Sequence, residues 1–338
     1  MLDTYVGVLD QDDPLYEVLA LRVYPEIRRP VFHVERLSHT RLVYRYREAE
    51  TKRAVVGKFF DTRDQDESKV TRIKSEYRKL IRLRYLGLNC LPHYVVNPLC
   101  REERIGLAVA EEFIGGNDLD HYLKRAAWDG ASAPLEEALA RLAAFLYRLH
   151  SKSALDRIPH GSASAHLNEV AAYFMRIVAT LQRQGLLSPN RAAAYLRLRD
   201  RWLQHARMQA EAVTVHGDAT PTNFLFPNGD GVVAIDLERM RDADRVYDVG
   251  MVCGELKHAF LWRMGRLHVS EPFIHHFLWR YARNFPAPEG AFWEITQRVP
   301  FYMALTELRI ARNTWLDWEY RRRLVREARE CLTWGLEL

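Results

Sequence analysis

The chain has 338 residues, of which 48% are hydrophobic and 28% are charged, and its formal net charge is +5. This composition is typical of a globular protein, and the length favours two domains over one. The first residues lack a signal-peptide core, and no apolar run approaches the roughly 18 residues that span a bilayer. We therefore expect a cytoplasmic protein without membrane insertion. No dense Lys/Arg block suggests a nucleic-acid partner.

Short apolar runs separated by polar turns follow residue 30. The runs are at 31–34, 42–46 and 54–60, and the first connection is the polar loop Ser38-His39-Thr40. Three successive short strands joined by turns predict an antiparallel meander. Residues 1–30 are compatible with either helix or strand.

A helix is predicted over residues 68–86, where apolar side chains such as Ile73 and Leu80 share one face. Glu76 lies on this same stripe, and a buried carboxylate needs a partner. Lys58, a cation inside an apolar strand, is the nearest partner in the sequence. In the alternative interpretation, Lys58 points outward at a sheet edge and Glu76 is solvated at the margin of the stripe.

Gly115-Gly116 marks the expected domain boundary, after further strand candidates at 94–96 and 105–110. Beyond it the pattern is mostly helical, with helices expected at 119–127, 135–150, 167–184, 190–212 and from 248 onward. Six of the eight tryptophans lie in this last segment. Most are expected to pack in the core, and Trp315 and Trp318 are possible walls of a substrate pocket.

The segment 215–248 contains the most informative polar residues. Residues 224–226 and 232–235 are short apolar strand candidates around a turn rich in Asn and Gly, which predicts a hairpin. This hairpin would bring Asn223 and Asp236 side by side, with Asp218 on a nearby loop. An amide oxygen and a carboxylate suit a hard cation such as Mg²⁺, and a second carboxylate suits a base. The alternative is an ordinary polar loop beside a hairpin.

The order of these parts resembles a protein-kinase-like fold, and more closely the aminoglycoside phosphotransferase and choline kinase family. The motifs that carry the resemblance are HGDATPTN at 216–223 and IDLE at 235–238. The resemblance implies an α+β, bilobal fold. Residues 1–114 would form an N-terminal nucleotide-binding lobe, an antiparallel sheet with one main helix. Residues 115–338 would form a mostly helical lobe for catalysis and substrate binding.

The implied activity is the transfer of the γ-phosphate of Mg-ATP to a hydroxyl group of a small molecule. By resemblance, Lys58 would contact the α- and β-phosphates of ATP and be held by Glu76. Asp218 would orient the acceptor hydroxyl and take its proton, while Asn223 and Asp236 would bind Mg²⁺. The remaining implied roles are adenine contacts from the backbone of Glu112 and Ile114, phosphate contacts from Ser38 and Thr40, and structural support of the catalytic loop from His216 and Asp248.

Three departures from protein kinases refine this expectation. The phosphate-covering loop at 38–40 has no glycine, Gly217 replaces the arginine that receives an activation-loop phosphate, and only twelve positions separate Asp236 from Asp248. The last two favour a small-molecule acceptor over a protein. The glycine-free loop keeps open a non-catalytic nucleotide-binding or scaffold protein of the same fold, and a protein kinase is a third hypothesis.

Overall fold

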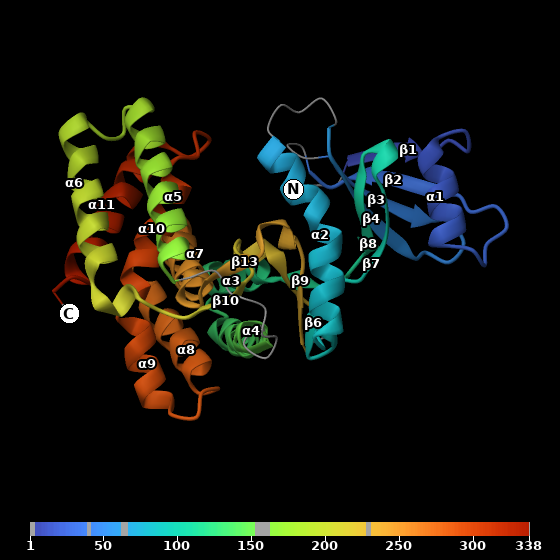
Figure 1. Ribbon diagram of the computed structural model, residues 1–338. Helices are drawn as coiled ribbons and strands as arrows, with labels where there is room; N and C mark the ends of the chain where they lie inside the picture. Colours follow the sequence, from blue (N-terminus) through green and yellow to red (C-terminus); the bar gives the residue numbers. More distant parts are fainter. Residues whose placement is uncertain (1–3, 39–41, 62–66, 153–162, 228–230, 338) are drawn as a thin grey trace. The chain divides into compact units, whose positions relative to one another are not determined.

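The computed structural model describes residues 4–38, 42–61, 67–152, 163–227 and 231–337 (Figure 1). Two compact units are present: the first contains residues 1–116 and 227–239, and the second contains residues 117–226 and 240–338. The first unit therefore takes up a short segment from late in the chain. Within the described residues, no helix combines the length and the hydropathy needed to cross a membrane.

The first unit is built on an antiparallel sheet with the strand order β1-β2-β3-β4-β8-β7 (Figure 1). The predicted meander is confirmed, because β2, β3 and β4 are neighbours in the sheet. The strands are β1 (Thr4–Val8), β2 (Phe32–Arg36), β3 (Val43–Glu48), β4 (Ala54–Phe59), β7 (Pro98–Glu102) and β8 (Leu107–Glu112).

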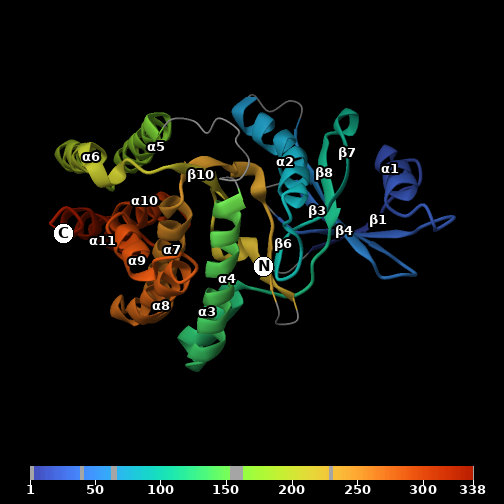
Figure 2. The ribbon, with the colours of Figure 1, turned by 60° about the horizontal axis from the view of Figure 1, so that its bottom comes forward.

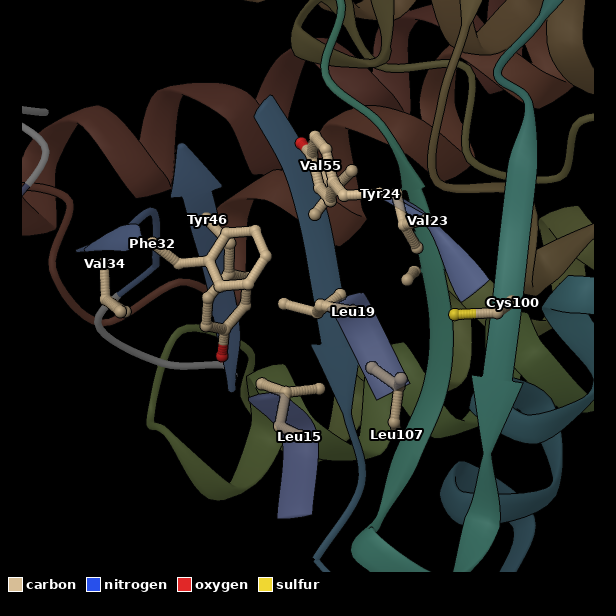
Figure 3. Close-up of a cluster of buried hydrophobic side chains, with 11 residues drawn as sticks. Leu15, Leu19, Val23, Tyr24, Phe32, Val34, Tyr46, Val55, Cys100 and Leu107 are labelled. Carbon is tan, nitrogen blue, oxygen red and sulfur yellow. The ribbon is translucent and has the colours of Figure 1, made fainter. Parts of the chain in front are cut away.

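Two helices cover opposite faces of this sheet (Figures 1 and 2). Helix α1 (Pro14–Arg22) begins at the N-cap Asp13, whose side chain accepts from the backbone N–H of Leu15. Leu15 and Leu19 of α1 point into one buried cluster with Phe32 of β2 (Figure 3). The first thirty residues thus supply both an edge strand and a covering helix.

Helix α2 (Glu67–Tyr85) lies on the other face and agrees with the predicted helix within one residue at each end. Its inward stripe buries Leu80 completely, and Glu76 on the same stripe is 1% exposed. The smaller elements of this unit are β5 (Asn89–Cys90), β6 (His93–Val95), the 3-10 turn η1 (Glu103–Ile105), β12 (Val232–Ala234) and η5 (Leu237–Arg239). Strand β12 runs parallel to β6, which ties the late segment into the first unit.

The second unit is mostly helical. Its helices are α3 (Leu119–Asp129), α4 (Ser132–Lys152), α5 (Ala163–Arg183), α6 (Pro189–Gln204), α7 (Val246–Met264), α8 (Glu271–Ala282), α9 (Pro288–Thr296), α10 (Val299–Ala311) and α11 (Trp318–Trp334). Its short elements are β9 (Asn117–Asp118), η2 (Ala206–Met208), β10 (Ala212–Val215), η3 (Pro221–Asn223), β11 (Phe224–Phe226), β13 (Arg241–Asp244) and η6 (His268–Ser270).

Helices α7 and α10 pack closely at two glycines. A Cβ atom added at Gly250 would collide with Tyr302, and one added at Gly254 would lie 2.8 Å from the Cβ of Thr306. Only hydrogen at these positions allows the two backbones to approach this closely. This approach brings the polar residues that follow the contact, Glu255 on α7 and Arg309 on α10, within reach of each other.

The helix predicted over 190–212 ends earlier, at Gln204. His205 has an extended backbone (φ −74°, ψ 133°), which breaks the helical hydrogen-bond pattern. Ala212, the last residue of the predicted helix, is instead the first residue of β10, which pairs with β13 and is buried throughout. A short fully buried strand has no alternating pattern, so periodicity alone does not separate it from a buried helix.

The expectation that most tryptophans pack in the core is wrong for the C-terminal segment. Trp202 of α6 is fully buried, whereas five of the six later tryptophans are exposed: Trp262, Trp293, Trp315, Trp318 and Trp334. These side chains lie on helix surfaces or on the loop before α11. An exposed aromatic is more informative than a buried one, because burial is the default for large apolar groups.

Candidate active site

Lys58 is the penultimate residue of β4, and its side chain points inward, toward α2. Its Nζ is 2.8 Å from Glu76 Oε1, 3.1 Å from Glu111 Oε1 and 3.9 Å from Asp236 Oδ1. The outward-pointing alternative for Lys58 is therefore wrong. Three elements of the first unit, β8, α2 and the segment after β12, each contribute one carboxylate to a single ammonium group.

This cluster carries more negative than positive charge. Burial disfavours the charged ammonium and by itself would lower the pKa of Lys58. The negative charges of Glu111, Glu76 and Asp236 outweigh the effect of burial, so the pKa of Lys58 is raised. Burial raises the pKa of Glu76 to about 7, with further contributions from Glu111 and Asp236 that Lys58 offsets only in part. The second carboxylate oxygens of Glu76 and Glu111 are buried without a hydrogen-bond partner among the described residues. This excess negative charge would be relieved by a further cation beside Asp236.

Asp236 follows β12 in a left-handed backbone conformation, with φ of 59°. Such a conformation is uncommon for a residue with a side chain, although Asp tolerates it better than most. The next residue, Leu237, donates its backbone N–H to Glu76 Oε1 at 3.0 Å. Lys79 of α2 also donates to the backbone oxygen of Glu238. Helix α2 therefore holds the turn that presents Asp236.

The loop after β10 is held by the buried carboxylate of Asp248. Asp248, in the first turn of α7, accepts the backbone N–H groups of His216 at 2.6 Å and Gly217 at 3.0 Å. His150 Nε2 lies 3.1 Å from the same carboxylate. These hydrogen bonds and charges overcome the effect of burial and lower the pKa of Asp248.

Gly217 adopts φ of 80°, which favours glycine. By resemblance, Gly217 stands where a protein kinase has arginine. In this chain the backbone at that position has a positive φ, which a residue with a side chain rarely adopts. The turn directs the next residue, Asp218, away from the buried anchor and leaves it partly exposed.

Asp218 is held from both its side chain and its backbone. Arg309 Nη1 of α10 lies 3.1 Å from Asp218 Oδ1, and Arg309 Nη2 donates to Glu255 of α7. Asn223 Nδ2 donates to the backbone oxygen of Asp218 at 2.9 Å. Among the residues that the structure describes, the amide oxygen of Asn223 has no hydrogen-bond partner, which leaves it available to a cation.

A cavity of about 400 Å³ lies beside this loop, within the second unit. The loop lines it through Thr220, Pro221 and Thr222, and Arg309 links it to Asp218. The other lining residues come from α3, α7, α10 and the following loop: Asp120, Glu255, His258, Ala259, Trp262, Arg263, Ile310, Arg312, Asn313 and Trp315. Its volume is in the range of small-molecule sites.

The remaining expected site residues lie at the ends of strands. Glu112 ends β8, and its side chain accepts from the backbone N–H of Asn97 at 2.7 Å and from the hydroxyl of Tyr94. Ile114 follows that strand, and Ser38 follows β2. Thr40 lies outside the described residues, so the phosphate-covering loop remains an expectation.

The hairpin strands expected around Asn223 and Asp236 are both present as β11 and β12, while residues 228–230 of the turn lie outside the described residues. Asn223 belongs to the second unit and Asp236 to the first. Their expected juxtaposition therefore stays a prediction.

Two residues of these clusters were not found by sequence reasoning. Glu111 was detectable, because it is two positions from Val109, which pairs with Lys58, so alternation places it on the same face of the sheet. Arg309 was not, because it is 91 residues from Asp218 and no local pattern connects them.

Solved structures of similar fold include an ethanolamine kinase from Plasmodium vivax, with a TM-score of 0.60 and 13% identity over 97% of this chain and 89% of that chain. The streptomycin–ATP–APH(2")-IIa ternary complex has a TM-score of 0.55 and 16% identity over 95% and 97% of the two chains. A macrolide 2'-phosphotransferase from Brachybacterium faecium has a TM-score of 0.51 and 16% identity over 93% and 97%. At these identities the likeness shows the fold.

A comparison with curated proteins gave no match. The model of the phosphotransferase enzyme family, in contrast, matches residues 33–288, which include Lys58, Glu76, Asp218 and Asp236. This match spans most of the chain, and the fold agrees with it. The chain therefore belongs to the phosphotransferase enzyme family.

Proposed function

We propose that the protein is a small-molecule kinase that transfers the γ-phosphate of Mg-ATP to a hydroxyl group. The observation that carries the proposal is the loop at 216–223. It is anchored to buried Asp248, presents Asp218 and lines a cavity of small-molecule size. Phosphoryl transfer requires mainly positioning and charge compensation, and an anchored loop of this kind supplies the positioning.

The nucleotide site of this proposal lies around Lys58. Its ammonium would contact the phosphates, and Glu76 at 2.8 Å would hold it in place. The backbone of Glu112 and Ile114 would face the adenine, and Ser38 would lie near the phosphates. Solved structures of similar fold include complexes with ATP, ADP and GDP, which supports nucleotide binding in general.

Asp236 and Asn223 would hold Mg²⁺, which neutralises phosphate oxygens when it is bound. Two observations support this fit. The carboxylates around Lys58 outnumber the cation, and the amide oxygen of Asn223 has no partner within the described part of the chain. Both residues offer the oxygen ligands that Mg²⁺ prefers.

The reaction itself would be an in-line displacement. The acceptor oxygen forms a bond to the γ-phosphorus as the bond from that phosphorus to the β–γ bridging oxygen breaks, and ADP leaves with the electron pair. Asp218 orients the hydroxyl and accepts its proton. Arg309 holds the Asp218 side chain through Oδ1 and so positions the carboxylate that would receive the proton.

A small acceptor is favoured over a protein because little chain separates Asp236 from α7. The residues between them form η5, β13 and short connections. No long activation segment or peptide-docking platform can be built from so few residues. Structures of similar fold include an ethanolamine kinase, an aminoglycoside phosphotransferase and a macrolide 2'-phosphotransferase, all of which act on small molecules.

Replacement of Asp218 tests the proposal. Asp218→Ala and Asp218→Asn should abolish turnover, measured as ADP release over a panel of alcohols, while Mg-ATP still raises the melting temperature as in the wild type. Full activity in either variant would refute the role of Asp218. A wild-type protein that binds Mg-ATP but consumes none with any alcohol would favour the nucleotide-binding scaffold, and phosphorylation of generic proteins would favour a protein kinase.

A further inference from the structure

We propose that the acceptor pocket selects a hydroxyl compound that carries a negative charge, and that Arg312 binds this charge. The inference rests on the proposed function, because it concerns the acceptor of the same reaction. It follows from the ionic groups of the cavity beside Asp218, all of which lie within the second unit.

The carboxylates that line the cavity already have cationic partners. Asp120 of α3 pairs with Arg263 of α7 and, at 2.8 Å, with Lys124. Glu255 pairs with Arg309, which also binds Asp218. A cationic acceptor would therefore have to share a carboxylate with an arginine or displace that arginine, and in either case the guanidinium would remain in the same pocket.

Arg312 is the exception among the lining cations. It caps the C-terminus of α10, is half-buried and lines the cavity. Its backbone oxygen accepts from Gln184 Nε2 at 2.9 Å, which fixes the position of its backbone. Within the described ranges of the chain, its guanidinium has no carboxylate partner.

The total charge of the lining is therefore positive. Arg263, Arg309 and Arg312 face Asp120 and Glu255, so the cations exceed the carboxylates by one. The partners just outside the lining, Lys124 and Asp218, add one charge of each sign. His258 does not change this balance, because burial, with Arg263 and Arg309 nearby, lowers its pKa to about 4 and leaves it neutral. An anionic group would balance the excess, whereas a cationic group would meet like charge.

The walls of the cavity indicate what else the acceptor carries. Trp262 is 46% exposed and Trp315 is 73% exposed, and both line the cavity. Their indole rings offer flat apolar surfaces to a ligand that remains partly open to water. The ligand class that fits is a hydroxylated ring or chain that carries a carboxylate or a phosphate.

A matched set of sugars tests this selection on the full chain without nucleotide. Calorimetry measures the binding of glucuronate, glucose 6-phosphate, glucose and glucosamine. These four sugars share one ring and differ in charge, and the two anions distinguish a carboxylate from a phosphate. At least one anionic sugar should bind about tenfold more tightly than glucose, and glucosamine should bind most weakly. Tightest binding by glucosamine, or no binding of either anion, overturns the proposal.

Substitutions at Arg312 complete the test. Arg312→Gln should lower the affinity for the anion about tenfold and leave that for glucose unchanged, and Arg312→Glu should make glucosamine the tighter ligand. Arg197→Gln, an exposed arginine of α6 outside the cavity, is the matched control and should change neither. Unchanged anion affinity in Arg312→Gln overturns the assignment.

Kinase assays separate this inference from the proposed function. Transfer of phosphate to a cationic alcohol, with anions rejected, would establish the kinase and overturn the charge selection. Binding of an anionic sugar that depends on Arg312, in a protein that transfers phosphate to no alcohol, would support the charge selection and refute the kinase activity.

Discussion

Arg309 and Asp218 form an ion pair, with 3.1 Å between Nη1 and Oδ1, although α10 and the loop after β10 are far apart in the sequence. The same guanidinium binds Glu255 through Nη2. One arginine thus fixes the proposed base and a carboxylate of the acceptor cavity at the same time. The position of Asp218 therefore depends on the packing of α7 against α10.

Arg309→Gln should lower kcat by about tenfold to a hundredfold, because a charge-assisted hydrogen bond that positions Asp218 is lost and two carboxylates remain without their cation. Arg309→Lys should recover only part of this loss, since an ammonium group lacks the two-sided geometry of a guanidinium. Steady-state kinetics should show the change in kcat, with the KM for nucleotide nearly constant. A loss confined to nucleotide KM would argue against the positioning role.

Glu111→Gln should tighten Mg-nucleotide binding by about threefold to tenfold. The substitution removes one of three carboxylates that compete for Lys58, and it lowers the negative charge that the phosphates meet. Titration with Mg-ATP, followed by thermal shift, measures the effect. Glu103→Gln on η1 is a control, because Glu103 forms exposed ion pairs outside this cluster. Weaker binding in Glu111→Gln would show that Lys58 needs both glutamates.

Asp236→Asn should raise the Mg²⁺ concentration required for nucleotide binding about tenfold or more, because a neutral amide is a poorer ligand than a carboxylate. Asn keeps the size of the side chain and tolerates the left-handed backbone at φ 59°. Nucleotide affinity is measured over a range of Mg²⁺ concentrations. Metal-free ADP binding serves as the internal control, and an unchanged Mg²⁺ dependence would contradict the role of Asp236 as a ligand.

Glu307→Gln should stabilise the protein at pH 8 and have little effect at pH 4. Burial raises the pKa of Glu307 from 4.5 to about 8, and Lys257 offsets this only in part while Glu327 adds to it. The folded state then binds the proton more tightly than the unfolded state, so stability is lost as pH rises from about 4.5 to about 8.

Neither carboxylate oxygen of Glu307 has a hydrogen-bond partner among the described residues, which agrees with a protonated group in a poor environment for charge. Melting temperatures of both proteins over this pH range measure the difference. Glu319→Gln is a control, since Glu319 is exposed on α11 and is not among the charges that shift the pKa of Glu307. A melting-temperature difference that did not grow with pH would contradict the raised pKa.

Gly250→Ala should destabilise the protein by about 1–3 kcal/mol, because the added methyl group would overpack the contact between α7 and Tyr302. Gly290→Ala is the matched control. A Cβ at Gly290, in α9, would meet nothing within 4 Å, so the better helix propensity of Ala should stabilise by about 0.5–1 kcal/mol. Chemical denaturation of both variants measures the change in the free energy of unfolding, which should fall for Gly250→Ala and rise for Gly290→Ala. Equal changes in the two variants would contradict the packing argument.

Much of the candidate site could be predicted because its chemistry is local in the sequence. Asp218, Asn223 and Asp236 lie within nineteen positions, and their spacing alone indicated a cation site with a base. Glu76 was found because it is a charged residue on the apolar face of a predicted helix, and Lys58 because it is a charged residue within an apolar strand. Each of these signals depends only on periodicity and composition over short windows.

The rest could not be read from local patterns. The partner of Asp218 comes from α10, and it reaches the loop only because glycines allow α7 and α10 to pack closely. The helix predicted to continue to Ala212 ends at Gln204, and no Gly or Pro between these two residues marks its end in the sequence. The exposure of Trp315 and Trp262 depends on which helix surfaces remain uncovered, which is decided by tertiary packing.

The anchoring of the loop by Asp248 has a consequence for how this protein can change over evolutionary time. The loop that presents Asp218 is fixed by Asp248 of α7, whereas Arg312 and Trp315, on the rim of the cavity, make no side-chain hydrogen bond, ion pair or ring contact among the described residues. Substitutions on the rim can therefore alter acceptor choice while folding and phosphoryl transfer stay intact.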